Sequence, residues 1–452
     1  MRVICIGAGP SGLYLAYKLK TLFTDYTLEV YGKNEDIGGT WFEDRYPGCT
    51  CDVPSHMYTY YFEPKCNWPA SYASAPEFHG YFSGFADKHG LRDLISCSHR
   101  VVGANWDDVS SQWNVRVEDP KREVFERRSD FLINATGYLN SWRWPSIPGL
   151  GSFNGRLLHT ANWDESLPLT GKRVGLIGIG SSGKQLLPEL QKTCMRRPTW
   201  VIPEMRYKKC RYTDEEKQTL RDNHRKLLQL RKDIEANYTT LLPLFLKDTL
   251  AEKLIPEHPF RCRRLTPSTD YLENLKKPNI TPSGGIMLDG SEYALDVLVC
   301  ATGFQTSFRP VFPLTGRNDT NLAEVWEKQP RSYLGIAAHS FRNYFMLLGP
   351  NSPLGNSPLL IYTCTFEPKL EAVDDFMERK DSFMKSTIWE NDCRSWFKNA
   401  NTGKVSGLWP GSGLSYIEAL AVQRFEDFHI TYATKNRFAY LGNGFSQTYL
   451  QT

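Results

Sequence analysis

Two glycine-rich turns carry the clearest chemistry in this sequence of 452 residues. The first turn has the spacing G-x-G-x-x-G, with Gly7, Gly9 and Gly12 at the fixed positions. In such a turn the first glycine permits a tight bend, the second lets the backbone approach a pyrophosphate, and the third lets a helix pack on a strand. The free N–H groups of the helix N-terminus then face the phosphates. The spacing therefore predicts a dinucleotide site.

The same spacing returns near the middle of the chain. The residues that we expect to meet the phosphates of a second nucleotide are Gly178, Gly180, Ser181, Ser182 and Gly183. The tripeptide Ala-Thr-Gly also occurs twice, at 135–137 after FLIN and at 301–303 after VLVC. Each glycine turn and its tripeptide bracket one nucleotide unit, so the repetition predicts two such units.

Short apolar runs at 3–6 and 174–177 precede the two turns, and helix-like stretches follow them. A lone G-x-G-x-x-G is weak evidence, but a strand before it and a helix after it supply the context that a nucleotide-binding turn needs. A strand, turn and helix that bind no nucleotide are the alternative. We predict the α/β class, with two Rossmann-like dinucleotide-binding domains and a helical insertion.

The chain divides by composition into four parts. We expect a first nucleotide domain from 1–140 and 305–452, a connector rich in Pro, Trp and Gly at 141–170, a second nucleotide domain from 171–205 and 255–304, and a charged helical insertion at 206–254. The insertion is expected to cap a cleft between the domains. A helix that binds a partner is the alternative.

Composition excludes several classes of function. Hydrophobic residues make up 41% and charged residues 23% of the chain, as in ordinary globular proteins. A net charge of +4 is too small for a chain of this size to indicate binding to nucleic acid or to an anionic membrane. No apolar run is long enough to span a membrane, and the apolar start is interpreted as a strand rather than a signal peptide, so we expect a cytoplasmic protein. The eleven cysteines form no metal-ligand pattern, which predicts reduced thiols and no metal.

One ordered string lies just before the second turn. It consists of Phe153, Gly155, His159, Trp163 and Asp164, and it fits the pattern F-x-G-x-x-x-H-x-x-x-W-[P/D]. Through this string the sequence resembles the type I Baeyer–Villiger monooxygenases. The resemblance implies FAD on the first nucleotide domain and NADPH on the second. It also implies that the string, including its histidine, supports domain motion in the linker rather than proton transfer.

A second motif of the same family follows the first nucleotide turn. Gly38-Gly39-Thr40-Trp41, Arg45-Tyr46-Pro47-Gly48 and Asp52 resemble G-G-T-W-x-x-x-R-Y-P-G-x-x-x-D. Thr40 would offer a hydroxyl to the phosphates or ribose of FAD, and Trp41 a flat apolar wall. The resemblance places the Asp52 carboxylate near the flavin, where it would orient a catalytic arginine; a turn-capping aspartate is the alternative. Tyr58 and Val101 are further candidate cofactor contacts.

The arginine is expected in the segment CRRLTPSTDYLE, where Arg263 and Arg264 align with a basic pair of the family. By this resemblance Arg264 is catalytic, while Arg263 and Arg196 lie near the NADP phosphate. A guanidinium stays protonated and presents a rigid fork of donors. It could therefore hold a flavin C4a-peroxide and the oxyanion that develops on a ketone. A solvated basic pair is the alternative.

The resemblance implies a monooxygenase that uses FAD, NADPH and O2 to insert oxygen next to a ketone carbonyl, giving an ester or lactone. The segments FEDRYPGCTCDVPSHMYTY and LWPGSGLSYIEAL are closer to fungal members that tailor polyketide or terpenoid skeletons. Two alternatives stay open. One is a flavin monooxygenase that hydroxylates its substrate or oxygenates nitrogen or sulfur, and the other is a flavin-binding homologue with impaired catalysis.

Two positions depart from the family pattern. Gly32 stands where an acidic residue would accept hydrogen bonds from the FAD ribose, and losing a buried acceptor costs about 1–3 kcal/mol. After the second turn, Gln191 is followed almost directly by Arg196, so a strand of the second unit is missing there. Residues 199–202 could replace it, which would displace Arg196. We therefore expect weakened NADPH binding.

Overall fold

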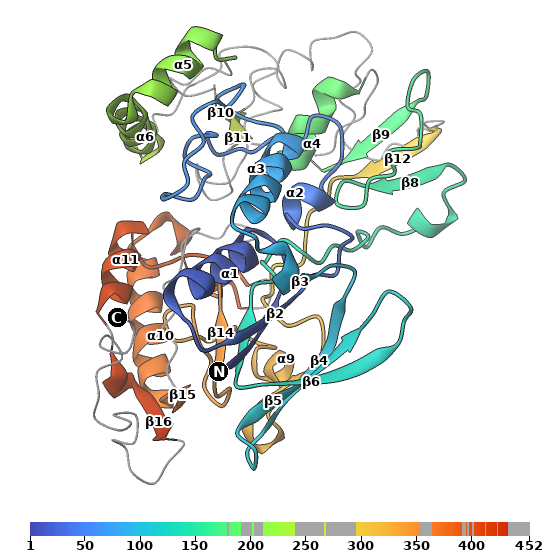
Figure 1. Cartoon of the computed structure of the whole chain (residues 1–452). Helices are drawn as coiled ribbons and strands as arrows, with labels where there is room; N and C mark the ends of the chain where they lie inside the picture. Colours follow the sequence, from blue (N-terminus) through green and yellow to red (C-terminus); the bar gives the residue numbers. More distant parts are fainter. Residues whose placement is uncertain are drawn as a thin grey trace.

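The structure, a computed structural model, describes residues 1–178, 180–190, 201–202, 211–239, 266–267, 295–352, 364–390, 395, 397–399, 402–411, 413–422 and 424–432. Its core is a parallel sheet of five strands in the order β14-β7-β1-β2-β3 (Figure 1). The strands are β1 (Arg2–Ile6), β2 (Thr27–Tyr31), β3 (Ile95–Ser96), β7 (Phe131–Asn134) and β14 (Tyr344–Met346). The sheet therefore joins the first part of the chain to a strand from beyond residue 305.

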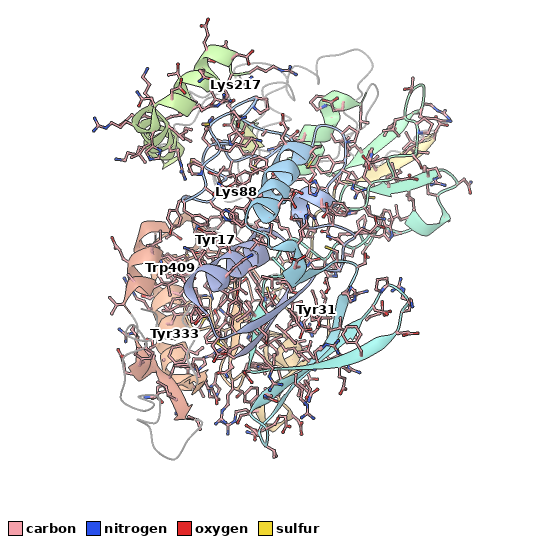
Figure 2. All side chains as sticks on the ribbon, viewed as in Figure 1. Tyr17, Tyr31, Lys88, Lys217, Tyr333 and Trp409 are labelled. Carbon is pink, nitrogen blue, oxygen red and sulfur yellow. The ribbon has the colours of Figure 1, made fainter. Side chains whose placement is uncertain are left out.

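The strand β1 is buried on both faces, and each face belongs to a different core. Val3 and Cys5 belong to one hydrophobic cluster, whereas Ile4 and Ile6 belong to another. Successive side chains of a strand point to opposite sides of a sheet, which explains this alternation. Helix α1 (Pro10–Leu22) contributes to the first cluster, as does α3 (Ala75–Lys88). Figure 2 shows these side chains, with Tyr17 on α1 and Tyr31 on β2 labelled.

The second cluster lies against a smaller sheet of four strands. Its order is β13-β4-β5-β6, formed by β13 (Leu314–Thr315), β4 (Arg100–Asp107), β5 (Gln112–Glu118) and β6 (Val124–Ser129). Trp113 of β5 is fully buried there, and its indole N–H donates to the carbonyl oxygen of Arg342. This sheet covers the face of the nucleotide sheet opposite α1 and α3, so both faces of β1 exclude water.

A second parallel sheet contains the later glycine turn. Its order is β8-β12-β9, with β8 (Arg156–His159), β12 (Val297–Cys300) and β9 (Val174–Ile177). The turn leads into α4 (Ser181–Leu186) and the 3₁₀ helix η3 (Leu187–Glu189). The short strand β10 (Val201–Ile202) pairs with β11 (Thr266–Pro267). Among the described residues β10 does not pair with β9, so residues 201–202 do not supply the missing neighbour of that strand.

The helical insertion packs against the first unit. Helices α5 (Asp214–Asp222) and α6 (His224–Thr239) lie apart from both nucleotide sheets (Figure 1). The segment before α5 reaches the first unit, because the N–H of Tyr212 donates to the carbonyl oxygen of Pro69 and the Tyr212 ring meets the edge of His56. Figure 2 labels Lys217 on α5. No described helix is both long and apolar enough to cross a membrane.

The remaining elements complete the chain. They are α2 (Thr40–Glu43), α9 (Leu322–Val325), α10 (Leu370–Lys385), α11 (Gly413–Ala421), β15 (Cys364–Pro368) and β16 (Phe428–Tyr432), together with the 3₁₀ helices η1 (Arg92–Leu94), η2 (Leu150–Ser152), η4 (Arg317–Asp319), η5 (Ile388–Glu390) and η6 (Phe425–Asp427). β15 and β16 pair antiparallel beside α10. The predicted fold class, α/β with two Rossmann-like units and a helical insertion, is confirmed.

Candidate active site

The first glycine turn leaves no room for side chains. Gly7 has a φ of +115°, and a methyl group on it would lie 2.4 Å from the carbonyl oxygen of Ala135. A methyl group on Gly12 would lie 2.0 Å from the carbonyl oxygen of Gly7. Both positions therefore require glycine. The turn holds the N-terminus of α1 against the end of β1, where its N–H groups are available to phosphates.

The loop that begins at Gly38 lies directly against this turn. The N–H of Gly38 donates to the carbonyl oxygen of Ala8 over 3.0 Å. A methyl group on Gly9 would lie 3.5 Å from the Cα of Gly39, and Gly39 has a φ of +57°. Two backbones thus approach each other without side chains between them. This contact brings Thr40, the first residue of α2, beside the turn.

Trp41 forms the apolar wall expected next to the cradle. Its ring stacks on Phe78 at 4.7 Å and meets Tyr58 edge-on at 5.2 Å. The side chain is buried, and its indole N–H has no hydrogen-bond partner among the described residues. A buried donor of this kind usually has a partner, which a bound group with acceptor atoms would supply. The cradle and the unpartnered donor therefore fit FAD.

Tyr58 and Val101 occupy different positions around the first unit. The Tyr58 ring meets the Trp41 ring edge-on and also contacts Phe82. Val101 lies on β4, and its side chain is buried in the second hydrophobic cluster. The structure therefore shows the Val101 side chain packed in a hydrophobic core. A contact with the cofactor stays a prediction for both residues.

The end of β2 confirms that no carboxylate follows the strand. Gly32 donates its N–H to the carbonyl oxygen of Ser96, and a methyl group on Gly32 would lie 2.8 Å from the Cβ of Ala8. The next residue, Lys33, forms an ion pair with Glu43 over 2.7 Å. A larger side chain at position 32 would therefore have to displace Ala8.

The second glycine turn repeats the geometry of the first. Gly178 has a φ of +104°, and a methyl group on it would lie 2.2 Å from the carbonyl oxygen of Ala301. A methyl group on Gly183 would lie 2.2 Å from the carbonyl oxygen of Gly178. Gly180, by contrast, has nothing within 4 Å of such a group. The turn is closed from behind and open at its middle glycine, which fits a phosphate group approaching the first residue of α4, Ser181.

Helix α4 also contacts the loop that links the first motif to Asp52. The hydroxyl of Tyr46 donates to Oε1 of Gln185 over 2.7 Å, and Nε2 of Gln185 donates to the carbonyl oxygen of Thr50 over 2.8 Å. The Ser182 hydroxyl also hydrogen-bonds with Tyr46, whose pKa burial raises well above its usual value. Side chains near the second turn therefore hold the loop of the first unit, a contact between distant segments that the motifs do not reveal.

A buried lysine on the same helix interacts electrostatically with the expected active-site carboxylate. Lys184 is 1% exposed, and burial lowers its pKa to about 8, while the Asp52 carboxylate acts in the opposite direction. Asp52 itself is half-buried. Sequence reasoning missed Lys184, although one signal was present: a charged residue directly after the glycine turn, on the part of the helix that must pack inward.

His159 ends β8 inside an aromatic cluster. It stacks on Trp142 at 4.6 Å and meets Trp144 edge-on at 5.9 Å. The N–H of Ala161 donates to Nδ1 over 3.1 Å, so in the neutral ring Nε2 carries the hydrogen and donates to the Thr302 hydroxyl at 3.2 Å. Burial lowers the pKa of His159 to about 4. The ring is therefore neutral near pH 7 and holds neighbouring segments together.

The rest of the ordered string is built around the same strand. Gly155 allows close approach, since a methyl group there would lie 2.6 Å from the carbonyl oxygen of Asp296. Asp164 accepts from the N–H of Ser166 and from Arg156, and Trp163 is partly buried against the first cluster. Phe153 packs its ring beside Gly155. Because β8 pairs with β12, the string flanks an edge strand of the second sheet, and His159 is its one residue within that strand.

Three predicted arginines, Arg196, Arg263 and Arg264, lie outside the described residues. Their roles at the NADP phosphate and at the reacting oxygen therefore stay predictions. Within the part of the chain that the structure describes, no three His, Cys, Asp or Glu side chains are placed to hold a metal ion.

The chain is similar to known proteins along nearly its whole length. The family of NAD(P)-binding Rossmann-like domains matches residues 5–67. The FAD-binding monooxygenase tazF of Aspergillus terreus is 36% identical, over 98% of this chain and 91% of tazF. The FAD-binding monooxygenase stcW of Emericella nidulans is 32% identical, over 99% of this chain and 86% of stcW. The alignment with tazF spans 516 residues, so tazF has residues that this shorter chain lacks.

Solved structures share the fold. The closed crystal structure of cyclohexanone monooxygenase has a TM-score of 0.80 and 26% identity, covering 96% of this chain and 99% of that chain. Oxidised steroid monooxygenase bound to NADP has a TM-score of 0.78 and 25% identity, covering 96% of this chain and 100% of that chain.

Proposed function

Because the chain belongs to the FAD-binding monooxygenases and resembles their Baeyer–Villiger members, we propose that it inserts one oxygen atom of O2 next to a ketone carbonyl. The product would be an ester or a lactone, and NADPH would supply the electrons. The observation that carries the proposal is the contact between the segments that follow the two cradles. Helix α4, which begins at the second glycine turn, packs on the loop that connects the first cradle to Asp52.

We expect each cradle to bind one cofactor. The backbone at Gly7, Gly9 and Gly12 would hold the FAD pyrophosphate, with Trp41 as an apolar wall that offers its indole N–H. The backbone around Gly180 would hold the pyrophosphate of NADPH. When bound and reduced, FAD supplies the oxygen chemistry. The protein supplies placement, because the first and third glycines of each cradle lie against backbone and fix the path of the turn.

The charged residues would stabilise the insertion. Arg264 would remain protonated and face the negative charge that develops on oxygen in the transition state. Asp52 would orient that guanidinium. Arg263 and Arg196 would meet the 2′-phosphate of NADPH. These roles rest on the family resemblance of the sequence.

The relatives support a ketone as the substrate class. Cyclohexanone is a ketone, and cyclohexanone monooxygenase shares the fold along its whole length. The sequence likeness to fungal tailoring enzymes supports a polyketide or terpenoid ketone as substrate. Oxygenation of nitrogen or sulfur is less well supported, because the string from Phe153 to Asp164 is intact.

A flavin-binding homologue with impaired catalysis is the second candidate. Two observations favour it: Gly32 at the end of β2, and β9, which pairs with β12 alone among the described strands. The first removes a ribose contact. The second leaves open which strand holds the adenosine part of NADPH.

The test is product analysis with a panel of cyclic and open-chain ketones under ¹⁸O₂. We expect non-covalent FAD in the purified protein, reduction by NADPH without air, and an ester or lactone that contains one ¹⁸O atom. Protein that contains no flavin and takes none up would contradict the proposal. Flavin reduction without any oxygenated product would favour the impaired homologue.

The variant Arg264→Ala isolates the insertion step. FAD should stay bound and reducible, whereas product formation should fall by about a hundredfold to a thousandfold, the usual cost of losing one group that stabilises an oxyanion. Arg263→Ala is the matched control, since it should weaken NADPH binding and leave insertion intact. Full ester formation by the Arg264→Ala variant would show that another cation serves the reacting oxygen.

A further inference from the structure

Lys184 is a buried charge in an unusual place. It is the fourth residue of α4, directly after the second glycine turn, and it is 1% exposed. Lysine is almost never buried unless its ammonium group is paired, because removing it from water is costly. The position therefore requires an explanation beyond packing.

Contacts of the next residue, Gln185, place this lysine beside the loop of the first unit. Its neighbour Gln185 donates to the carbonyl oxygen of Thr50 over 2.8 Å, two residues before Asp52. A methyl group on Gly48 would lie 2.5 Å from the carbonyl oxygen of Gln185, so the loop touches the helix backbone there. The Asp52 carboxylate is the charge that acts on the Lys184 ammonium group.

We propose that Lys184 is a positioning residue, which holds the Asp52 carboxylate from the helix that begins at the second glycine turn. The inference rests on the proposed function and adds a residue to it. Asp52 would then be held from the NADP-binding unit, by Lys184, as well as by its own loop. A shift of α4 relative to the loop would move the carboxylate, so the position of the second unit would set the geometry near the flavin.

The rival explanation is an ion pair that only stabilises the fold. The chain offers a control for it. Lys380 on α10 is also fully buried, pairs with Asp381 over 2.5 Å and donates to the carbonyl oxygen of Val405 over 2.8 Å. Its helix, α10, lies beside β15 (Figure 1). Replacing either lysine by methionine removes a charge of the same kind from a buried site.

The experiment compares four single variants, Lys184→Met, Lys184→Arg, Lys380→Met and Asp52→Asn, with the double variant Lys184→Met/Asp52→Asn. For each variant we measure FAD content, the urea unfolding midpoint and the rate of flavin reduction. We also measure kcat for product and the fraction of NADPH whose electrons end in hydrogen peroxide. We expect Lys184→Met to keep FAD, to lower kcat by at least about tenfold because reacting groups are misplaced, and to raise peroxide release. Lys184→Arg should restore most of the rate.

Two results distinguish a positioning role of Lys184 from a purely stabilising ion pair. In the Asp52→Asn background, Lys184→Met should change kcat by less than about twofold, since residues that act through one another do not add. Lys380→Met should lower the unfolding midpoint but leave kcat and peroxide release unchanged. Equal effects of Lys184→Met with and without Asp52, or a loss of stability as its only effect, would overturn the inference. A wild type that reduces its flavin but oxygenates no ketone would refute the proposed function instead. The coupling between Lys184 and Asp52 would still be measurable in the unfolding midpoint and in the rate of flavin reduction.

Discussion

The two glycine turns are nearly identical in their local geometry and differ in what surrounds them. In each, the third glycine lies against the carbonyl oxygen of the first, at 2.0 Å for a methyl group on Gly12 and 2.2 Å on Gly183. In each, the alanine of an Ala-Thr-Gly segment donates its N–H to the residue before the turn. β1, however, has strands on both sides, whereas β9 pairs with β12 alone among the described strands.

The helices after the turns differ as well. α1 has 13 residues and a buried face of leucines, whereas α4 has 6 residues and passes into η3 at Leu187. The comparison shows that a phosphate cradle needs only a few local residues. Holding the rest of a dinucleotide needs a neighbouring strand, which parallel sheets supply from elsewhere in the chain. Among the described residues, the first unit therefore has more of the parts of a dinucleotide site than the second.

The largest expected effect separates the two cradles. Gly12→Val would drive a side chain into the carbonyl oxygen of Gly7, and Gly183→Val would do the same at Gly178. Such overpacking costs at least about 1–3 kcal/mol. We expect Gly12→Val to yield protein without flavin, and Gly183→Val to keep FAD but lose reduction by NADPH. Flavin absorbance and anaerobic reduction measure the two outcomes; loss of flavin in both variants would mean that the cradles are not independent.

Nucleotide selectivity tests the missing strand. We expect weak NADPH binding, less than about tenfold preference over NADH, and a strong dependence on Arg263. Because a hydrogen bond to a charged group contributes about 1.5–3 kcal/mol, Arg263→Ala should weaken NADPH binding by about tenfold or more and leave NADH binding unchanged. Anaerobic titration of flavin reduction with each nucleotide gives the constants. Tight, selective reduction by the unaltered chain would show that its second unit lacks nothing.

Acid should destabilise both units through one buried histidine each. Burial lowers the pKa of His56 and of His159 to about 4, whereas the unfolded side chain titrates near 6.5. Between these values the unfolded chain binds more protons, so stability is fully present above pH 6.5 and falls as the pH drops toward 4. Each site contributes up to about 3 kcal/mol. Urea midpoints at pH 7.5 and 5.0 should show a smaller pH dependence for His159→Phe and for His56→Phe than for wild type.

The smallest expected effect concerns Gly32. Glutamate at this position would offer the ribose an acceptor but would also collide with Ala8, 2.8 Å away. Gly32→Glu alone should therefore leave FAD affinity nearly unchanged. The pair Ala8→Gly/Gly32→Glu removes the collision and should tighten FAD binding by about tenfold, the value of one hydrogen bond of about 1 kcal/mol or slightly more. Titration of apo-protein with FAD decides, and the pair Ala8→Gly/Gly32→Ala is the control without an acceptor.

The sequence by itself determined the two glycine turns, the strand before each and the helix after each. Their geometry follows from local sterics, because a residue with a side chain fits neither the positive φ of Gly7 and Gly178 nor the contacts behind them. The family could be identified for the same reason: its motifs are short and contiguous. Spacing also showed that Gly32 leaves the end of β2 without a carboxylate.

Only the tertiary structure decided which of these parts touch. The approach of Gly39 to Gly9, the stacking of Trp142 on His159, and the electrostatic interaction of the buried Lys184 with Asp52 each join residues that no local pattern relates. Val101 likewise lies in a core that forms only when the four-stranded sheet covers β1. Motifs encode turns because the backbone there is restricted within a few residues. Contacts between units depend instead on how whole sheets and helices pack, and the free energy of that packing is spread over the entire chain.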